Sequence, residues 1–92
     1  MIISFHCRET EKIFNGRFSK KFAAIERPAL RKLTILDAAE KLGHLAGKGN
    51  SLEALKKDRV GQHSIRVNDQ YRLCFRWQDA EAHDVEIVDY HD

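Results

Sequence analysis

With 92 residues, 42% of them hydrophobic, the chain can build one compact domain spanning residues 1–92, and a second hydrophobic core is excluded. No apolar run approaches the roughly 20 residues that a membrane-spanning helix needs. Residues 1–8 lack the charged and apolar regions of a secretion signal. We therefore expect a cytoplasmic domain that does not contact a membrane.

Charge is distributed unevenly along the chain. The net charge is +2, yet all 16 Lys and Arg fall within residues 1–76, against 8 acids there, whereas residues 77–92 carry six acids and no base. Basic side chains gain affinity for a polyanion because binding releases its counterions. The basic body therefore favours a polyanionic partner. An acidic end that only screens its basic neighbours is the alternative, and composition leaves both open.

The cysteines and most of the histidines lack a metal-binding pattern. Cys7 and Cys74 have no CxxC partner, and His6, His44 and His83 show no ligand spacing with them or with one another. We predict two separate packed thiols, no metal site and no cofactor.

The first part of the chain predicts a short strand, a short helix and a linker. Residues 2–6 favour β structure and are expected to join a sheet. Residues 8–14 predict a brief helix that ends at Asn15-Gly16, because both of these residues tolerate positive φ. Residues 17–22 form a basic linker, and we expect both of its phenylalanines to pack on the domain.

The longest helix is predicted over residues 23–43. Pro28 fits its first turn, and Gly43 is expected to end it. We interpret the apolar stripe along one face as core packing, with a partner-binding face as the alternative. The stripe consists of Ala29, Leu33, Leu36 and Ala39.

A loop and a basic cluster follow this helix. The glycines of residues 44–50 match no phosphate-binding motif, so we assign no nucleotide site to them. The cluster Lys56-Lys57-Asp58-Arg59 resembles an ordinary solvated loop, but it precedes the strands of the predicted sheet. That position makes it a candidate for contact with phosphate.

Period-two alternation predicts antiparallel strands over residues 63–67 and 71–77, with turns at residues 68–70 and 79–82. Apolar side chains occupy one face, and the other face carries Ser64, Arg66, Arg72, Cys74 and Arg76. A helix can cover the apolar face, which leaves Arg66 and Arg72 on an open basic surface, the predicted site. His63 alternates with the apolar residues and is assigned to the half-buried face.

The last strand, predicted over residues 85–92, ends in Asp89, Tyr90 and His91. A β-branched run leads directly into these residues, so we expect them to be held in place. A carboxylate, a phenol and an imidazole can together bind and move protons. Packing at the edge of the sheet is the structural alternative.

The ordered set of motifs resembles the HigB branch of the RelE/ParE toxin superfamily. The resemblance is strong over the last 40 residues and extends over the first 50 by length and element order. It implies an α+β fold of the RelE-like, microbial-ribonuclease type, with an N-terminal strand and helices packed on one face of a small, mainly antiparallel sheet. The motifs that carry it are Leu52-Glu53-Ala54-Leu55-Lys56-Lys57-Asp58-Arg59, Gly61, Ser64-Ile65-Arg66-Val67-Asn68, Tyr71-Arg72 and Asp89-Tyr90-His91.

The resemblance also implies the toxin of a type II toxin–antitoxin pair. Such toxins enter the ribosomal A site and cleave translated mRNA without a metal. A helix-turn-helix HigA antitoxin neutralises them, and the complex represses its operon by binding operator DNA. By position, the catalytic residues implied are Arg72, Asp89, Tyr90 and His91, and the RNA contacts expected are Lys56, Lys57, Arg59, Arg66 and Gln70.

Metal-independent cleavage of RNA assigns a role to each catalytic residue. A base must take the 2′-hydroxyl proton, a cation must stabilise the phosphorane, and an acid must protonate the departing 5′-oxygen. We expect His91 and Asp89 to carry protons and Arg72 and Lys56 to stabilise charge. Tyr90 offers a ring on which an exposed base can stack.

One position departs from the family pattern. Many members carry Leu-His-Pro-Leu at residues 52–55, so Glu53 replaces a histidine that is often counted as catalytic. Glu53 is then a base, a residue that orients Arg72 or His91, or an exposed side chain without a catalytic role. Two other functions stay open: a ParE-like, non-catalytic inhibitor of DNA gyrase, since fold does not fix function, and a weakly active RNA-binding homologue.

Overall fold

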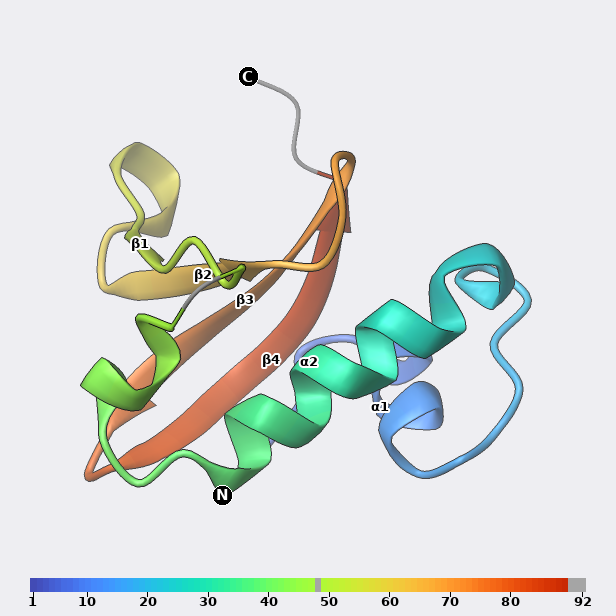
Figure 1. Cartoon of the computed structure of the whole chain (residues 1–92), viewed down its shortest axis with the longest axis horizontal. Coiled ribbons are helices and arrows are strands. Elements are labelled where there is room, and N and C mark those ends of the chain that lie inside the picture. Colours follow the sequence, from blue (N-terminus) through green and yellow to red (C-terminus); the bar gives the residue numbers. More distant parts are fainter. Residues whose placement is uncertain (48, 90–92) are drawn as a thin grey trace.

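The computed structural model describes residues 1–47 and 49–89, and these form two α-helices, three 3₁₀ turns and a four-stranded antiparallel sheet of order β1-β2-β3-β4 (Figure 1). The predicted α+β fold is confirmed. The elements are α1 (Arg8–Phe14), η1 (Ala23–Ile25), α2 (Glu26–Ala38), η2 (Leu42–Leu45), β1 (Glu53–Ala54), η3 (Lys57–Arg59), β2 (Gln62–Arg66), β3 (Tyr71–Gln78) and β4 (Glu81–Asp89).

The N-terminal segment joins the sheet along the outer edge of β4, as predicted. Its backbone donates from Ile3 to Ala82 at 2.8 Å and from His6 to Val85 at 3.0 Å. The contact consists of two isolated parallel bridges instead of a continuous strand. The reason lies in β4, where Asp84 has φ +52 and its N–H donates to the Ser4 hydroxyl at 2.9 Å. The register between β3 and β4 also shifts here, between Cys74 and Arg76, which marks a β-bulge. The bulge lies between the two bridges, at Ala82 and Val85, and interrupts the pairing of β4 with the N-terminal segment.

The long helix is shorter at both ends than the predicted span of residues 23–43. An α-helix that began at Ala23 would need an N–H on Pro28, which has none, so residues 23–25 form a 3₁₀ turn and Pro28 lies in the first turn of α2. At the other end Ala39 is extended, with φ −69 and ψ 131. Gly43 therefore does not end α2 but lies within η2. In α1, by contrast, Gly16 at φ +75 follows the helix as expected.

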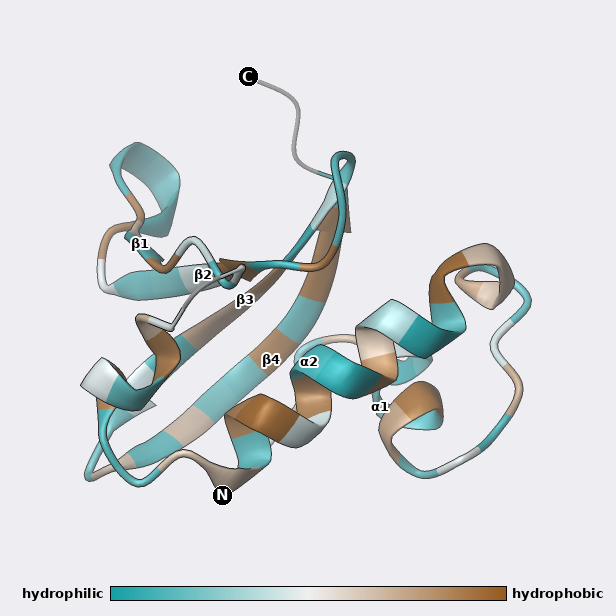
Figure 2. Cartoon of the chain, viewed as in Figure 1, coloured by the Kyte–Doolittle hydropathy of each residue, from teal (hydrophilic) through white to brown (hydrophobic). Residues whose placement is uncertain are grey.

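The core lies between α2 and one face of the sheet. The stripe predicted on the helix is confirmed, because Ala29, Leu33 and Leu36 are fully buried. They belong to one hydrophobic cluster with the apolar face of the strands, and β4 alternates hydrophobic and hydrophilic residues along its length (Figure 2). The strand residues of this cluster are Ile65, Leu73, Phe75, Ala82, Val85 and Ile87.

Only one of the two linker phenylalanines packs on the domain. Phe22 is buried, but Phe18 is 68% exposed, so the prediction for Phe18 was wrong. The buried Ser19 explains the difference, because its hydroxyl donates to the Glu9 carboxylate at 2.8 Å and accepts from the Phe22 N–H at 3.3 Å. Ser19 therefore turns inward, and its neighbour Phe18 turns outward.

The hairpin that joins β3 and β4 is tighter than predicted. Asp79 and Ala80 alone form the turn, both at positive φ, and β4 starts at Glu81. Two central residues at positive φ suit the right-handed twist of the flanking strands. His63 lies on the half-buried face, as expected, with its ring stacked on Phe75 at a centroid separation of 6.3 Å.

Candidate functional site

The polar face of the sheet carries the predicted basic residues, but the residues at its centre are covered and do not contact solvent. Strand pairing aligns Arg66 with Arg72 and Ser64 with Cys74, so these four side chains share one face, as the alternation predicted. Ser64 and Cys74 are nevertheless fully buried. Two arginines close over them: Arg72 bonds to Ser64, and the charges of Arg59 and Arg72 both act on the thiol of Cys74.

Arg72 is the best-fixed cation on this face. Its Nε donates to the Ser64 hydroxyl at 2.7 Å, and its Nη2 donates to the carbonyl oxygen of Ser64 at 3.3 Å and to that of Ser51. The side chain is only 12% exposed. A guanidinium held in this way can meet developing negative charge without a further cost of reorganisation.

Glu53 lies next to Arg72. It is paired with Ser64 across β1 and β2, and its Oε1 is 4.0 Å from Nη2 of Arg72. The side chain is 54% exposed, so water screens the attraction. Among the roles considered for Glu53, the contact fits a residue that orients Arg72.

The basic turn, residues 55–59, lies beside Glu53. Buried Leu55 anchors its start, and the Leu55 N–H donates to the Gln62 carbonyl at 2.9 Å. Lys56 and Lys57 are exposed and line a surface hollow of about 370 Å³ together with Glu53 and Leu55. Lys57 has φ +57, a left-handed conformation that costs on the order of 1–2 kcal/mol in a residue with a Cβ.

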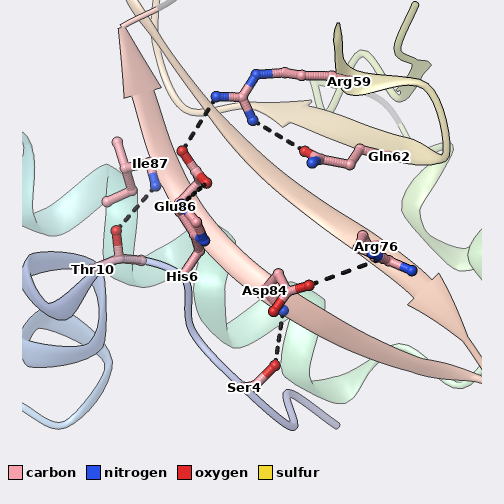
Figure 3. Close-up of polar contacts among 9 residues, drawn as sticks. All are labelled: Ser4, His6, Thr10, Arg59, Gln62, Arg76, Asp84, Glu86 and Ile87. Atoms are coloured by element: carbon pink, nitrogen blue, oxygen red, sulfur yellow. Dashed lines mark hydrogen bonds and ion pairs between the residues drawn. The ribbon is translucent and has the colours of Figure 1, made fainter.

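Arg59 differs from the two lysines because its guanidinium already has partners. Its Nη1 donates to Oε1 of Gln62 at 3.1 Å, and its Nη2 donates to Oε1 of Glu86 at 3.3 Å (Figure 3). Glu86 also lies 3.6 Å from Nε2 of His6. Sequence reasoning missed Glu86 and His6, although Glu86 alternates with Val85 and Ile87 and so belongs to the polar face.

The other predicted residues lie at the end of the sheet near the β2–β3 turn, where Arg66 is directly paired with Arg72. Arg66 pairs with Asp69 in the β2–β3 turn, and Gln70 donates through Nε2 to Oδ2 of Asp89 at 3.0 Å. Register places Asp89 opposite Tyr71. Directly paired residues share a face, so Asp89 is on the side of the sheet that carries the core, opposite to Arg72. The structure therefore does not bring Asp89 and Arg72 together.

The remaining members of the predicted triplet, Tyr90 and His91, lie outside the described residues, so their predicted roles stay predictions. Among residues 1–47 and 49–89, three or more His, Cys, Asp or Glu side chains nowhere gather in a way that could hold a metal ion. Within the same part of the chain, no helix is long and apolar enough to cross a bilayer.

Burial controls the chemistry of Cys74. Removal of the thiol from water raises its pKa to about 11, and the nearby carboxylate of Glu86 acts in the same direction. The guanidinium groups of Arg59 and Arg72 oppose this shift but do not outweigh it. Cys74 is thus a neutral packed thiol near pH 7, which agrees with the prediction from its sequence context.

The whole fold is similar to that of a solved structure. A chain of the YoeB–YefM complex from Staphylococcus aureus aligns with a TM-score of 0.57 over 100% of this chain and 99% of the other. At 18% sequence identity, this likeness defines the class of fold alone.

The family follows from the sequence. The model of the RelE-like toxin of the type II toxin–antitoxin system HigB matches residues 8–91, and the chain belongs to this family. It is 48% identical over 61 residues to Toxin HigB-1 of Vibrio cholerae serotype O1 and 33% identical over 60 residues to Endoribonuclease HigB of Proteus vulgaris. The two alignments cover 65% of this chain in each case, and 64% and 65% of the relatives' own length.

Proposed function

We propose that the chain is the toxin of a type II toxin–antitoxin pair and a metal-independent endoribonuclease that cleaves translated mRNA in the ribosomal A site. The name of the Proteus vulgaris relative supports an endoribonuclease. The observation that carries the proposal is Arg72, whose guanidinium is fixed on the polar face of the sheet beside Glu53. A pre-positioned cation is what a phosphorane needs when no metal balances its charge.

The residues of the polar face divide the work of cleavage between them. Arg72 stabilises the phosphorane, and Glu53 orients Arg72 from 4.0 Å. Lys56 and Lys57 bind the phosphates that flank the scissile bond, since both are exposed beside Glu53. His91 carries the protons, and Tyr90 stacks on a base of the mRNA. Asp89 lies on the opposite side of the sheet from Arg72, so we assign it no role in the step at Arg72. Arg66, which is paired with Arg72, and Gln70 contact the RNA at the β2–β3 turn.

The proposal also names the partners. A HigA-type helix-turn-helix antitoxin neutralises the chain, and operator DNA is bound only through the toxin–antitoxin complex. The ribosome presents the mRNA, which places the activity in the cytoplasm. Support for an antitoxin partner comes from the family match and from the fold likeness to a chain solved in the YoeB–YefM complex.

A reconstituted reaction tests the proposed activity. The purified chain is added to ribosomes that carry a defined mRNA with an empty A site, and in parallel to the same mRNA without ribosomes. We expect a cut within the A-site codon in the first reaction and intact mRNA in the second. Two results together would overturn the proposal in favour of a gyrase inhibitor: intact mRNA in both reactions, and inhibition by this chain of the DNA supercoiling that purified gyrase catalyses.

A further inference from the structure

The ion pair between Arg59 and Glu86 crosses the polar face of the sheet. Arg59 belongs to η3, which precedes β2, whereas Glu86 lies on β4, two strands away. The side chains of Arg59 and Glu86 are 31% and 17% exposed. Glu86 is aligned with the buried Cys74 on β3. The ion pair between Arg59 and Glu86 therefore crosses β3 (Figure 3).

The surroundings of Arg59 do not suit a phosphate. The hollow next to the ion pair, about 460 Å³ in volume, is lined by two arginines and three carboxylates, with His6 and Gln62 completing it. The carboxylates belong to Asp58, Asp84 and Glu86. A phosphate placed here would meet more negative than positive charge, and Arg59 would have to leave both Glu86 and Gln62 to bind it.

The turn that carries the lysines is anchored at its start by the buried Leu55, and it needs a second attachment to the sheet at its end. Its backbone is closed by bonds from Arg59 to Lys56 and from Val60 to Lys57, each 3.2 Å, and Lys57 is held in the left-handed region. Val60, which follows the turn, is 74% exposed and contributes little packing. The side chain of Arg59 is therefore the part of η3 that ties the turn to the sheet through Glu86 and Gln62.

We propose that Arg59 and Glu86 form a clamp that positions the basic turn, so that Lys56 and Lys57 point at the RNA in one fixed arrangement. Arg59 is then a positioning residue and not an RNA contact. His6, 3.6 Å from Glu86, ties the N-terminal segment to the same carboxylate. The inference rests on the proposed endoribonuclease function, because the clamp acts through residues that bind the substrate.

The clamp makes predictions that differ from those of a direct phosphate contact. Glu86→Gln and Arg59→Gln should each lower kcat on ribosome-bound mRNA by at least about tenfold, since small misplacements of positioning groups have large effects on rate. KM should change little. If Arg59 contacted phosphate itself, Glu86→Gln would release it for binding and leave kcat intact, while Arg59→Gln would raise KM and reduce the dependence of binding on salt.

Asp84→Asn is the matched control. It removes the same charge from the same face and abolishes the ion pair with Arg76 at 3.9 Å, without touching the basic turn. Asn also tolerates the positive φ of this position. We expect its kcat to match that of the wild type. Thermal unfolding of Glu86→Gln, Arg59→Gln and Asp84→Asn shows whether a lower kcat comes from a displaced basic turn in a folded protein or from unfolding of the domain.

A second experiment tests whether the clamp acts through Lys56. In the wild-type background Lys56→Ala should lower kcat. In the Glu86→Gln background the same substitution should lower kcat by a much smaller factor, because the effects of coupled residues are not additive. Equal costs in both backgrounds would overturn the clamp. If a single variant unfolds below the assay temperature, the exchanged pair of Arg59→Glu with Glu86→Arg must recover cleavage, and its failure to do so also counts against the clamp.

These outcomes separate the clamp from the proposed function. If the wild-type chain cuts no RNA, the endoribonuclease proposal fails. If the wild type cuts ribosome-bound mRNA but Glu86→Gln behaves like Asp84→Asn, the function stands and the clamp alone is wrong.

Discussion

The Nε of Arg72 donates to the hydroxyl of Ser64 at 2.7 Å, and this bond joins two neighbouring strands on the polar face of the sheet. Ser64 is fully buried, so the bond is shielded from water and stronger than an exposed one. The cation that is proposed to stabilise the transition state is therefore held by the sheet itself.

Arg72→Ala should reduce cleavage of ribosome-bound mRNA by on the order of 100-fold or more, because one pre-positioned donor to the transition state is lost. Arg72→Lys should retain little of the wild-type activity, since an ammonium cannot reproduce the planar set of donors to Ser64 and Ser51. Initial rates measure both effects. Arg76→Ala, the loss of an exposed arginine on the same face, is the control, and a loss equal to that of Arg72→Ala would refute the assignment.

Glu53→Gln should lower kcat only a few-fold, because the exposed carboxylate orients Arg72 through a screened contact of 4.0 Å. Glu53→Arg should cost more, since a like charge would push the guanidinium of Arg72 away. Single-turnover rates distinguish the two variants. A loss for Glu53→Gln as large as that for Arg72→Ala would instead identify Glu53 as a proton carrier.

A buried bond between residues 77 positions apart links the N-terminal helix to the last strand. The Thr10 hydroxyl accepts the Ile87 N–H at 3.0 Å (Figure 3), and Thr10 is fully buried. Thr10→Val keeps the shape of the side chain but leaves this N–H without an acceptor. The free energy of unfolding should fall by about 1–3 kcal/mol. Urea unfolding measures it, and Thr10→Ser, which keeps the hydroxyl, should lose less.

Cys74 should resist alkylation in the folded protein. With the pKa of its thiol raised to about 11 by burial, only about one molecule in a thousand carries a thiolate at pH 8. Iodoacetamide should label the half-buried Cys7 first and Cys74 only after denaturation, as peptide mass analysis can establish. The raised pKa also means that the contribution of Cys74 to stability is present below pH 9 and is lost as the pH rises through about 11. Rapid labelling of folded Cys74 would contradict its burial.

Period-two patterns predicted the sheet well because one of its faces is buried. The alternation of Ile65, Leu73 and Phe75 with polar residues fixed which side chains lie on each face. Helix ends were less predictable from sequence, since α2 is limited by the missing N–H of Pro28 and by the extended backbone at Ala39. The exposure of Phe18 has no local signal, because it depends on the contact between Ser19 and the distant Glu9.

The candidate site was predicted as a set of residue types and not as a geometry. Alternation assigned Arg66 and Arg72 to the polar face correctly. The period-two alternation of Val85 and Ile87 extends to Asp89, so its place on the other side of the sheet from Arg72 could be inferred from the sequence, although it was not predicted. The bond between Arg59 and Glu86 joins positions 27 apart, which no motif links.

Ribosome-dependent cleavage is tested most directly by a map of RNA 5′ ends across the transcriptome of bacterial cells that produce this chain alone, with His91→Gln as the matched variant. We expect new ends at fixed positions within translated codons, absent with His91→Gln and absent when translation is blocked. Growth arrest with intact mRNA, or cleavage that is unchanged in the variant, would contradict it.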